Sequence, residues 1–137
     1  MIVNTCSLFR QIDSWKEHKI TFSDYKAGKD VPDYYGRDAS LSHPHVHHIH
    51  LAMTKSLEKA WKRKSAIHQL YYRTTKINDP DNDYWLLYAY DDIDEKYLLL
   101  TILGPDAHNN DKWRSYLQNL YLHFVEPWIL GKLECCE

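Results

Sequence analysis

Five of the nine histidines lie close together, in the run His-Pro-His-Val-His-His-Ile-His that begins at His43 and ends at His50. Side chains alternate along a β-strand, so we expect His48 and His50 to project from one face about 7 Å apart. Two imidazoles at that spacing can exchange protons with a phosphodiester, or can bind a metal ion if a third ligand comes from elsewhere. A third alternative is that they are solvated or packed without chemistry. We expect loop positions and no function for His43, His45 and His47.

Cleavage of RNA without a metal ion requires a base for the 2′-OH proton, a cation for the phosphorane and an acid for the leaving 5′-oxygen. Imidazoles suit the first and third roles, and an arginine fork suits the second. Asp106 is placed to orient a nearby imidazole. The predicted catalytic residues are His48, His50, Arg73 and His108. The alternatives are that Arg73 is a surface cation or ion-pair partner and that His108 has no chemical role.

These residues must be positioned by a sheet. Apolar or alternating stretches predict strands at residues 2–6, 47–53, 67–76, 84–90 and 97–103. Pairing of strands 47–53 and 67–76 would bring Arg73 near His50. Helical spacing predicts a helix over 14–27 and a second one that starts at Asn110 or Asp111 and is closed by Pro127. We expect an ordered loop at 31–38 and a charged helical turn or loop at 56–64.

The resulting order, β-α-β-β-β-β-α, predicts an α+β fold with an antiparallel sheet of about four to five strands and helices near both ends. Short turns between the last strands favour hairpins over crossovers. With 137 residues and no internal repeat, the chain 1–137 is expected to form one domain.

A basic segment offers a second way to contact nucleic acid. A cationic stretch with one aromatic residue can hold an RNA backbone while the ring stacks on a base. Its residues are Lys59, Trp61, Lys62, Arg63 and Lys64. The alternatives are a solvated charged face and a tryptophan that anchors the core. Because the formal net charge is −2, any binding of a polyanion must be local.

Composition limits where the protein acts. No apolar run approaches the length needed to span a bilayer, and the N-terminus has no basic region ahead of a hydrophobic stretch. We therefore expect a soluble cytoplasmic protein with no membrane partner. Three cysteines, Cys6 and the adjacent pair Cys135 and Cys136, lack CxxC spacing, which favours a reducing compartment and disfavours a thiolate zinc site.

Several short motifs follow one another between about residues 14 and 124. They are Phe22-x-x-Tyr25-Lys26, Pro32-Asp33-Tyr34-Tyr35-Gly36-Arg37-Asp38, His48-Ile49-His50-Leu51-Ala52, Tyr72-Arg73-Thr74, Tyr97-Leu98-Leu99-Leu100-Thr101-Ile102-Leu103 and Pro105-Asp106-Ala107-His108. Together they resemble the YafO-type toxins of bacterial type II toxin–antitoxin systems.

This resemblance implies a RelE-like microbial ribonuclease architecture and a ribosome-dependent mRNA interferase that inhibits translation. It also implies a small antitoxin protein as partner and mRNA on the ribosome as substrate. The positions that match the motifs are Gly36, Arg37, Asp38, His48, His50, Arg73, Asp106 and His108. The pattern does not say which of these is catalytic.

We therefore expect a metal-independent endoribonuclease without a cofactor. Its predicted substrate-binding residues are Arg37, Asp38, Asp106, Lys59, Trp61, Lys62, Arg63 and Lys64. Two alternatives stay open: a ribonuclease that needs no ribosome, and a non-catalytic His-rich protein that binds a metal ion or a partner.

Overall fold

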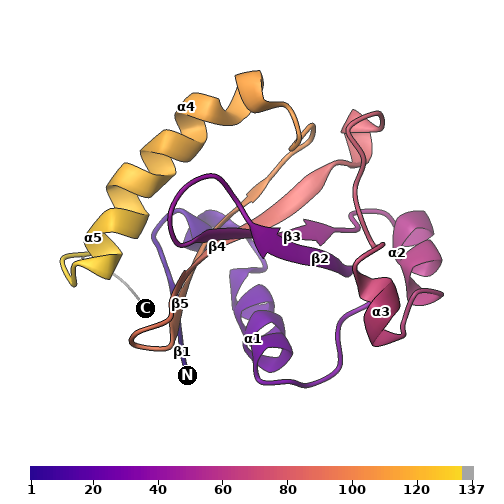
Figure 1. The fold of residues 1–137 in the computed structure, drawn as a ribbon, viewed down its shortest axis with the longest axis horizontal. Coiled ribbons are helices and arrows are strands. Elements are labelled where there is room, and N and C mark those ends of the chain that lie inside the picture. The colour runs from indigo at the N-terminus through magenta and orange to yellow at the C-terminus, as the bar shows by residue number, and fades with distance from the viewer. Residues whose placement is uncertain (134–137) are drawn as a thin grey trace.

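A five-stranded sheet forms the centre of the molecule in the computed structural model, which describes residues 1–133 (Figure 1). Its strands are β1 (Ile2–Thr5), β2 (Tyr35–Ser40), β3 (Val46–Leu51), β4 (Tyr84–Asp91) and β5 (Lys96–Leu103). Their order across the sheet is β1-β5-β4-β3-β2. Strands β2 to β5 pair antiparallel, whereas β1 runs parallel to β5. The α+β class expected from the sequence is confirmed.

Strands β4 and β5 lie inside the sheet because nearly all their side chains are apolar and can be buried on both faces. Leu86, Leu87, Leu98, Leu99 and Leu100 have no exposed surface. The two strands form the hairpin that the sequence predicts, with Tyr90 paired to Tyr97.

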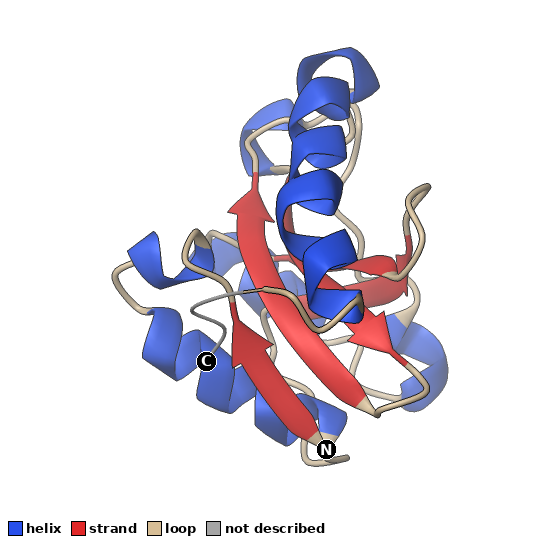
Figure 2. Cartoon of the chain, turned by 90° about the vertical axis from the view of Figure 1, so that its left-hand side faces the viewer, coloured by secondary structure: helices blue, strands red, loops and turns tan. Residues whose placement is uncertain are grey.

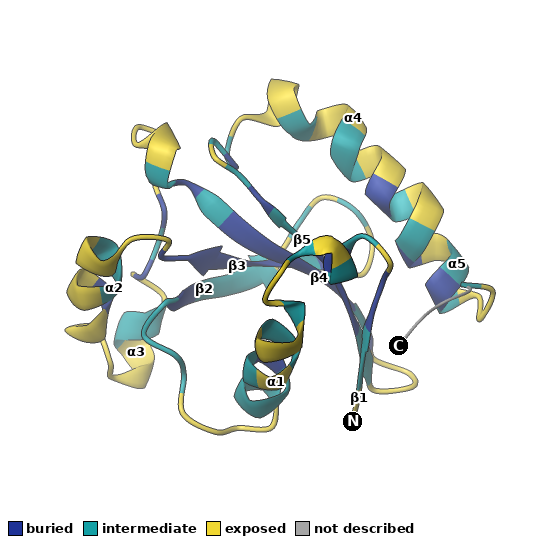
Figure 3. Cartoon of the chain, turned by 180° about the vertical axis from the view of Figure 1, so that it is seen from behind, coloured by how far each residue is buried: buried dark blue, intermediate teal, exposed yellow. Residues whose placement is uncertain are grey.

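Helices cover both faces of the sheet. Helix α1 (Trp15–Lys26) lies across one face, seen from its solvent side in Figure 3. There Phe22 packs edge-on against Tyr88 and Tyr97, with ring centroids 5.0 and 5.4 Å apart. On the other side, α4 (Asn110–Leu120) and α5 (Glu126–Ile129) lie over β5 and β1 (Figures 1 and 2). Neither helix reaches across β2 and β3 (Figure 1).

The edge of the sheet differs from the expected one. Residues 35–38, expected in a loop, belong to β2, while residues 67–76, expected to form a strand, contain the short helix α3 (Ile67–Leu70) and no strand. Ile67 is 88% exposed, so the apolar side chains of this segment do not face the core. Strand β3 pairs instead with β2 on one side and with β4 on the other. Helix α2 (Lys55–Lys62), capped by the Thr54 hydroxyl, confirms the charged helical turn.

Arg73 is buried and holds this irregular region together. Its guanidinium donates to the carbonyl oxygens of Pro32, Tyr35 and Lys64 at 3.1, 3.0 and 2.9 Å. The expectation that Arg73 lies on a strand beside His50 is therefore wrong, and the arginine serves as a cross-link between three segments. Its own carbonyl approaches Gly36 so closely that a Cβ there would stand 2.1 Å away, which requires glycine at that position.

The C-terminal helix also departs from expectation. Asn109 caps α4, accepting from the Lys112 N–H at 3.1 Å, and α4 continues through a π-helical turn, Tyr121–Val125, into α5. Pro127 does not close the helix, because it lies in the first turn of α5, where its missing N–H is not needed.

Two further observations concern the chain as a whole. Within residues 1–133, none of the helices combines the length and apolar character needed to cross a membrane. Cys6 is buried and unpaired with another cysteine, whereas Cys135 and Cys136 lie outside the described residues.

Replacing Arg73 with Ala should lower the free energy of unfolding by about 2–4 kcal/mol, because three carbonyls each lose a hydrogen bond and a buried space opens. Urea denaturation followed by tryptophan fluorescence measures this change. Lys76, an exposed cation in the same segment, is the matched control, and its replacement with Ala should change stability by less than about 0.5 kcal/mol. Equal effects of the two substitutions would contradict the structural role of Arg73.

Candidate active site

Three histidines meet on the face of the sheet opposite α1. His48 and His50 come from β3 and His108 from the loop after β5, and the Trp85 indole of β4 lies among them. The ring centroids of His48 and His50 are 5.1 Å apart, and those of His50 and His108 are 5.7 Å apart. Trp85 lies 4.4 Å from His48 and 4.8 Å from His108. Three imidazoles therefore share one small region.

His48 is oriented by the backbone of the neighbouring strand. Its Nδ1 lies 2.8 Å from the carbonyl oxygen of Ala39, which can only accept, so Nδ1 carries a proton. In the neutral ring the lone pair is then on Nε2. Burial lowers the pKa of His48 below its ordinary value, an effect that the Ala39 carbonyl partly opposes. A neutral His48 with a free Nε2 lone pair can accept a proton.

His50 has the opposite tautomer. His50 Nδ1 lies 2.9 Å from the Thr75 hydroxyl oxygen and 3.0 Å from the Thr75 backbone nitrogen. The backbone N–H can only donate, so we assign Nδ1 as the acceptor and place the proton on Nε2. Burial, followed by the nearby His48, His108 and Arg37, lowers the pKa of His50 to about 3. His50 is therefore a neutral N–H donor and a poor base.

His108 is held by a buried carboxylate. Its Nδ1 lies 2.7 Å from Asp83 Oδ2, and its backbone N–H donates to the same oxygen at 2.8 Å. The other oxygen, Asp83 Oδ1, accepts from the Thr75 hydroxyl at 2.7 Å. Thr75 thus links Asp83 to His50, and one network orients two of the three rings. An imidazole whose Nδ1–H faces a carboxylate is suited to proton transfer through Nε2.

Arg37 supplies a cation beside the histidines. Its Nε donates to the Tyr71 carbonyl at 2.9 Å, and its guanidinium carbon lies 3.8 Å from the centre of the Tyr71 ring. These contacts fix the side chain, while its two terminal nitrogens have no hydrogen-bond partner among residues 1–133. The positive charge of Arg37 acts on both His48 and His50, where it lowers their pKa values.

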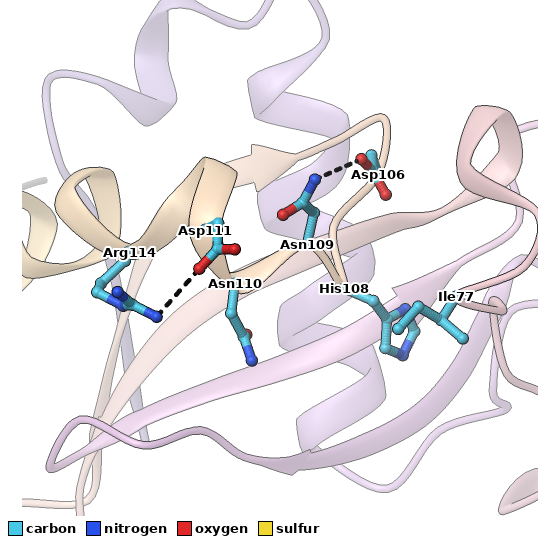
Figure 4. Close-up of a pocket in the computed structure, with 7 residues that line it drawn as sticks. All are labelled: Ile77, Asp106, His108, Asn109, Asn110, Asp111 and Arg114. Carbon is cyan, nitrogen blue, oxygen red and sulfur yellow. Dashed lines mark hydrogen bonds and ion pairs between the residues drawn. The ribbon is translucent and has the colours of Figure 1, made fainter.

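A hollow of about 500 Å³ opens beside His108 (Figure 4). Asp106 lines its rim together with the first turn of α4. A second hollow, of about 420 Å³, shares Asn110 and Arg114 with the first and extends toward Ser40 and His43. The first hollow therefore adjoins the cluster through His108, whereas His48 and His50 are only 8% and 3% exposed.

The structure brings some predicted site residues together and separates others. His48, His50, His108 and Arg37 are adjacent, and Asp106 lies on the rim of the hollow. Arg73 is absent from this group, because carbonyl oxygens of other segments occupy its guanidinium.

Asp38 lies on the α1 face of the sheet, away from the histidine cluster. Its carboxylate accepts from Tyr25, Lys26 and Tyr88, at distances of 2.6 to 2.9 Å. The prediction that Asp38 binds substrate is therefore replaced by a structural role. His47 lies on the same face, stacked on Tyr88 at 5.2 Å, and belongs to β3, as the strand predicted at 47–53 implies, and not to a loop.

In the basic segment, the structure buries the tryptophan and leaves the cations exposed. Trp61 is only 2% exposed and packs close to Gly36, so it anchors the core and is not available to stack on a base. The cations around it remain on the surface of α2 and the turn that follows. These exposed residues are Lys59, Lys62, Arg63 and Lys64.

Sequence reasoning missed Asp83, Thr75 and Trp85. Asp83 lies directly before a predicted strand, in a turn where aspartate is common, so its type gave no reason to select it. The pattern indicates Trp85 only as an apolar residue of that strand.

No group of three or more His, Cys, Asp or Glu side chains in the part of the chain that the structure describes could hold a metal ion.

A family model described as "Toxin YafO, type II toxin-antitoxin system" matches residues 23–129, which includes every residue of the histidine cluster. No curated protein and no solved structure matches the chain. A type II system pairs a toxin with an antitoxin, so this family implies an antitoxin partner. Because the match covers most of the sequence, the chain belongs to the YafO toxin family of type II toxin–antitoxin systems.

Proposed function

We propose that this toxin is a metal-independent endoribonuclease that cuts mRNA on the translating ribosome and thereby inhibits translation. The observation that carries the proposal is the histidine cluster, in which His48 can accept a proton, His50 can donate a hydrogen bond and His108 faces a carboxylate. Residues 1–137 act as one toxin domain without a cofactor. Since its substrate is translating mRNA, the toxin works in the cytoplasm.

The reaction transfers one proton at each end of the scissile bond. His48 Nε2 takes the proton of the 2′-OH, and the 2′-oxygen attacks the adjacent phosphorus. The bond from phosphorus to the 5′-oxygen breaks, and protonated His108 gives its Nε2 proton to that oxygen. The products are a 2′,3′-cyclic phosphate and a 5′-OH. General acid–base catalysis of this kind contributes about 10²- to 10⁴-fold in rate.

His50 and Arg37 stabilise the charge that develops on the phosphorane. The Nε2–H of His50 remains on a neutral ring at physiological pH, because its pKa is lowered to about 3. Arg37 is anchored through Nε, and in this mechanism its terminal nitrogens donate to the same oxygens. Fixed donors of this type act without reorganising during the reaction. Arg37 thereby takes the role that the sequence suggested for Arg73.

The ribosome supplies the orientation of the RNA that the toxin alone does not provide. Holding the message in a reactive geometry lowers the barrier without further groups from the toxin. Because the chain carries a net charge of −2, contact with RNA depends on local cations. Those cations are Lys59, Lys62, Arg63 and Lys64 on the surface of α2 and the following turn.

Replacing His48 with Gln should reduce cleavage at least about 100-fold, because the group that accepts the 2′-OH proton is lost. The measurement is 5′-end mapping of mRNA in a cell-free translation reaction that contains the purified toxin. His47→Gln is the matched control, since His47 is the next residue on β3 but faces α1. That control should cleave within a few-fold of the unchanged toxin.

Further arms of the same assay separate the rival functions. Cleavage should disappear when translation is blocked, and naked RNA should stay intact. Full cleavage of naked RNA would indicate a ribonuclease that needs no ribosome. An active His48→Gln toxin would contradict the mechanism, and a toxin that never cuts RNA would contradict the proposed activity.

The lowered pKa of His50 predicts a pH dependence of stability. Histidine in the unfolded chain takes up a proton near pH 6.5, whereas folded His50 stays neutral until about pH 3. The free energy of unfolding should therefore fall as the pH drops below 6.5, and it should fall less steeply for His50→Gln. Urea denaturation between pH 7.5 and pH 5 tests this difference. Identical slopes for the two proteins would contradict this, because they would mean that His50 takes up its proton over the same pH range in the folded and the unfolded chain.

A further inference from the structure

The two hollows beside the histidine cluster form one groove along α4. They share Asn110 and Arg114, so the space next to His108 continues into the space next to His43. One wall is the exposed side of α4, and the other is the end of β2 with the loop that follows, represented by Ser40 and Ser42. A polynucleotide that lies on the histidines can therefore extend into this groove.

Contacts between α4 and the opposite wall close the far end of the groove. His43 Nε2 lies 2.8 Å from Gln118 Oε1, and the rings of His43 and Tyr121 are 5.6 Å apart. Asn110 and Gln118 are separated by about 12 Å along the axis of an α-helix. The groove thus has room for a short stretch of RNA next to the cleaved bond.

Asn110 is the polar side chain that the groove shares with the region beside His108. It extends from α4 toward the sheet, on the side where the His108 ring lies (Figure 4). Its amide has no hydrogen-bond partner within residues 1–133, unlike Asn109, which caps the helix. Within residues 1–133, the polar partner of Arg114, one helical turn further on, is Asp111, in an exposed pair at 3.2 Å. An amide and a cation are therefore available to a ligand.

We propose that Asn110 determines the sequence preference of the toxin by hydrogen bonding to the nucleobase next to the scissile phosphodiester. This inference rests on the proposed ribonuclease activity. Single-stranded RNA is recognised through the exposed edges of its bases, and an amide offers both a donor and an acceptor to such an edge. Arg114 contacts the adjacent phosphate, which fixes the position of the RNA without selecting a base.

The test compares the cleavage sites of three variants in the cell-free translation assay. Asn110→Ala should reduce the preference for one base beside the cut by about five- to 100-fold, while cleavage continues at many sites. Asn110→Asp keeps the shape of the side chain but removes its donors, so the preference should move to bases that offer an amino group. Asn119→Ala, an exposed asparagine elsewhere on α4, should leave the preference unchanged.

Each outcome distinguishes this inference from the activity on which it rests. If Asn110→Ala and Asn110→Asp both cut at the same bases as the unchanged toxin, the inference is wrong and the ribonuclease remains. An equal loss of cleavage at all sites, with no change in preference, also overturns it. If the unchanged toxin does not cut mRNA, both proposals fall together.

Discussion

The buried carboxylate of Asp83 is the constraint on which the arrangement of the histidines depends. A carboxylate with no exposed surface requires hydrogen-bond donors from the protein, and Asp83 receives three of them from Thr75 and His108. Those bonds tie the segment after α3 to the loop after β5. Because Thr75 also donates to His50, satisfying one buried charge fixes the positions and tautomers of two imidazoles on different parts of the chain.

Because side chains alternate along β3, its structural residue and its proposed catalytic residues lie on opposite faces of the sheet. His48 and His50 face the open side of the sheet, while His47 faces α1 and stacks on Tyr88. On that inner side, Asp38 accepts from Tyr88 and from Lys26, which forms an ion pair with it. The polar groups that stabilise the sheet are thereby kept on the face that α1 covers, and the other face is left to the histidine cluster.

The spacing of apolar residues correctly predicted the helices and strands that have a regular apolar pattern. It gave wrong predictions where the local structure depends on contacts between residues distant in the sequence. Helix α1, β4, β5 and the shared face of His48 and His50 all follow from local patterns. Strand β2 was missed because its polar residues give no alternation, and the apolar alternation of 67–76 suggested a strand that does not form. The hydrogen-bond network around Asp83 joins residues 25 positions apart in the sequence, so no short motif predicts it. Likewise, only the folded chain shows that Arg73 serves three carbonyls.

The pairing of β1 with β5 has a consequence for the synthesis of the toxin. Val3 pairs with Tyr97, so the segment made first cannot join the sheet until the hairpin near the other end has been made. The proposed site is likewise incomplete until His108 has emerged. A partly made chain that lacks His108 therefore carries no complete set of imidazoles, and the proposed site can form only after β5 and the loop that follows it have been made.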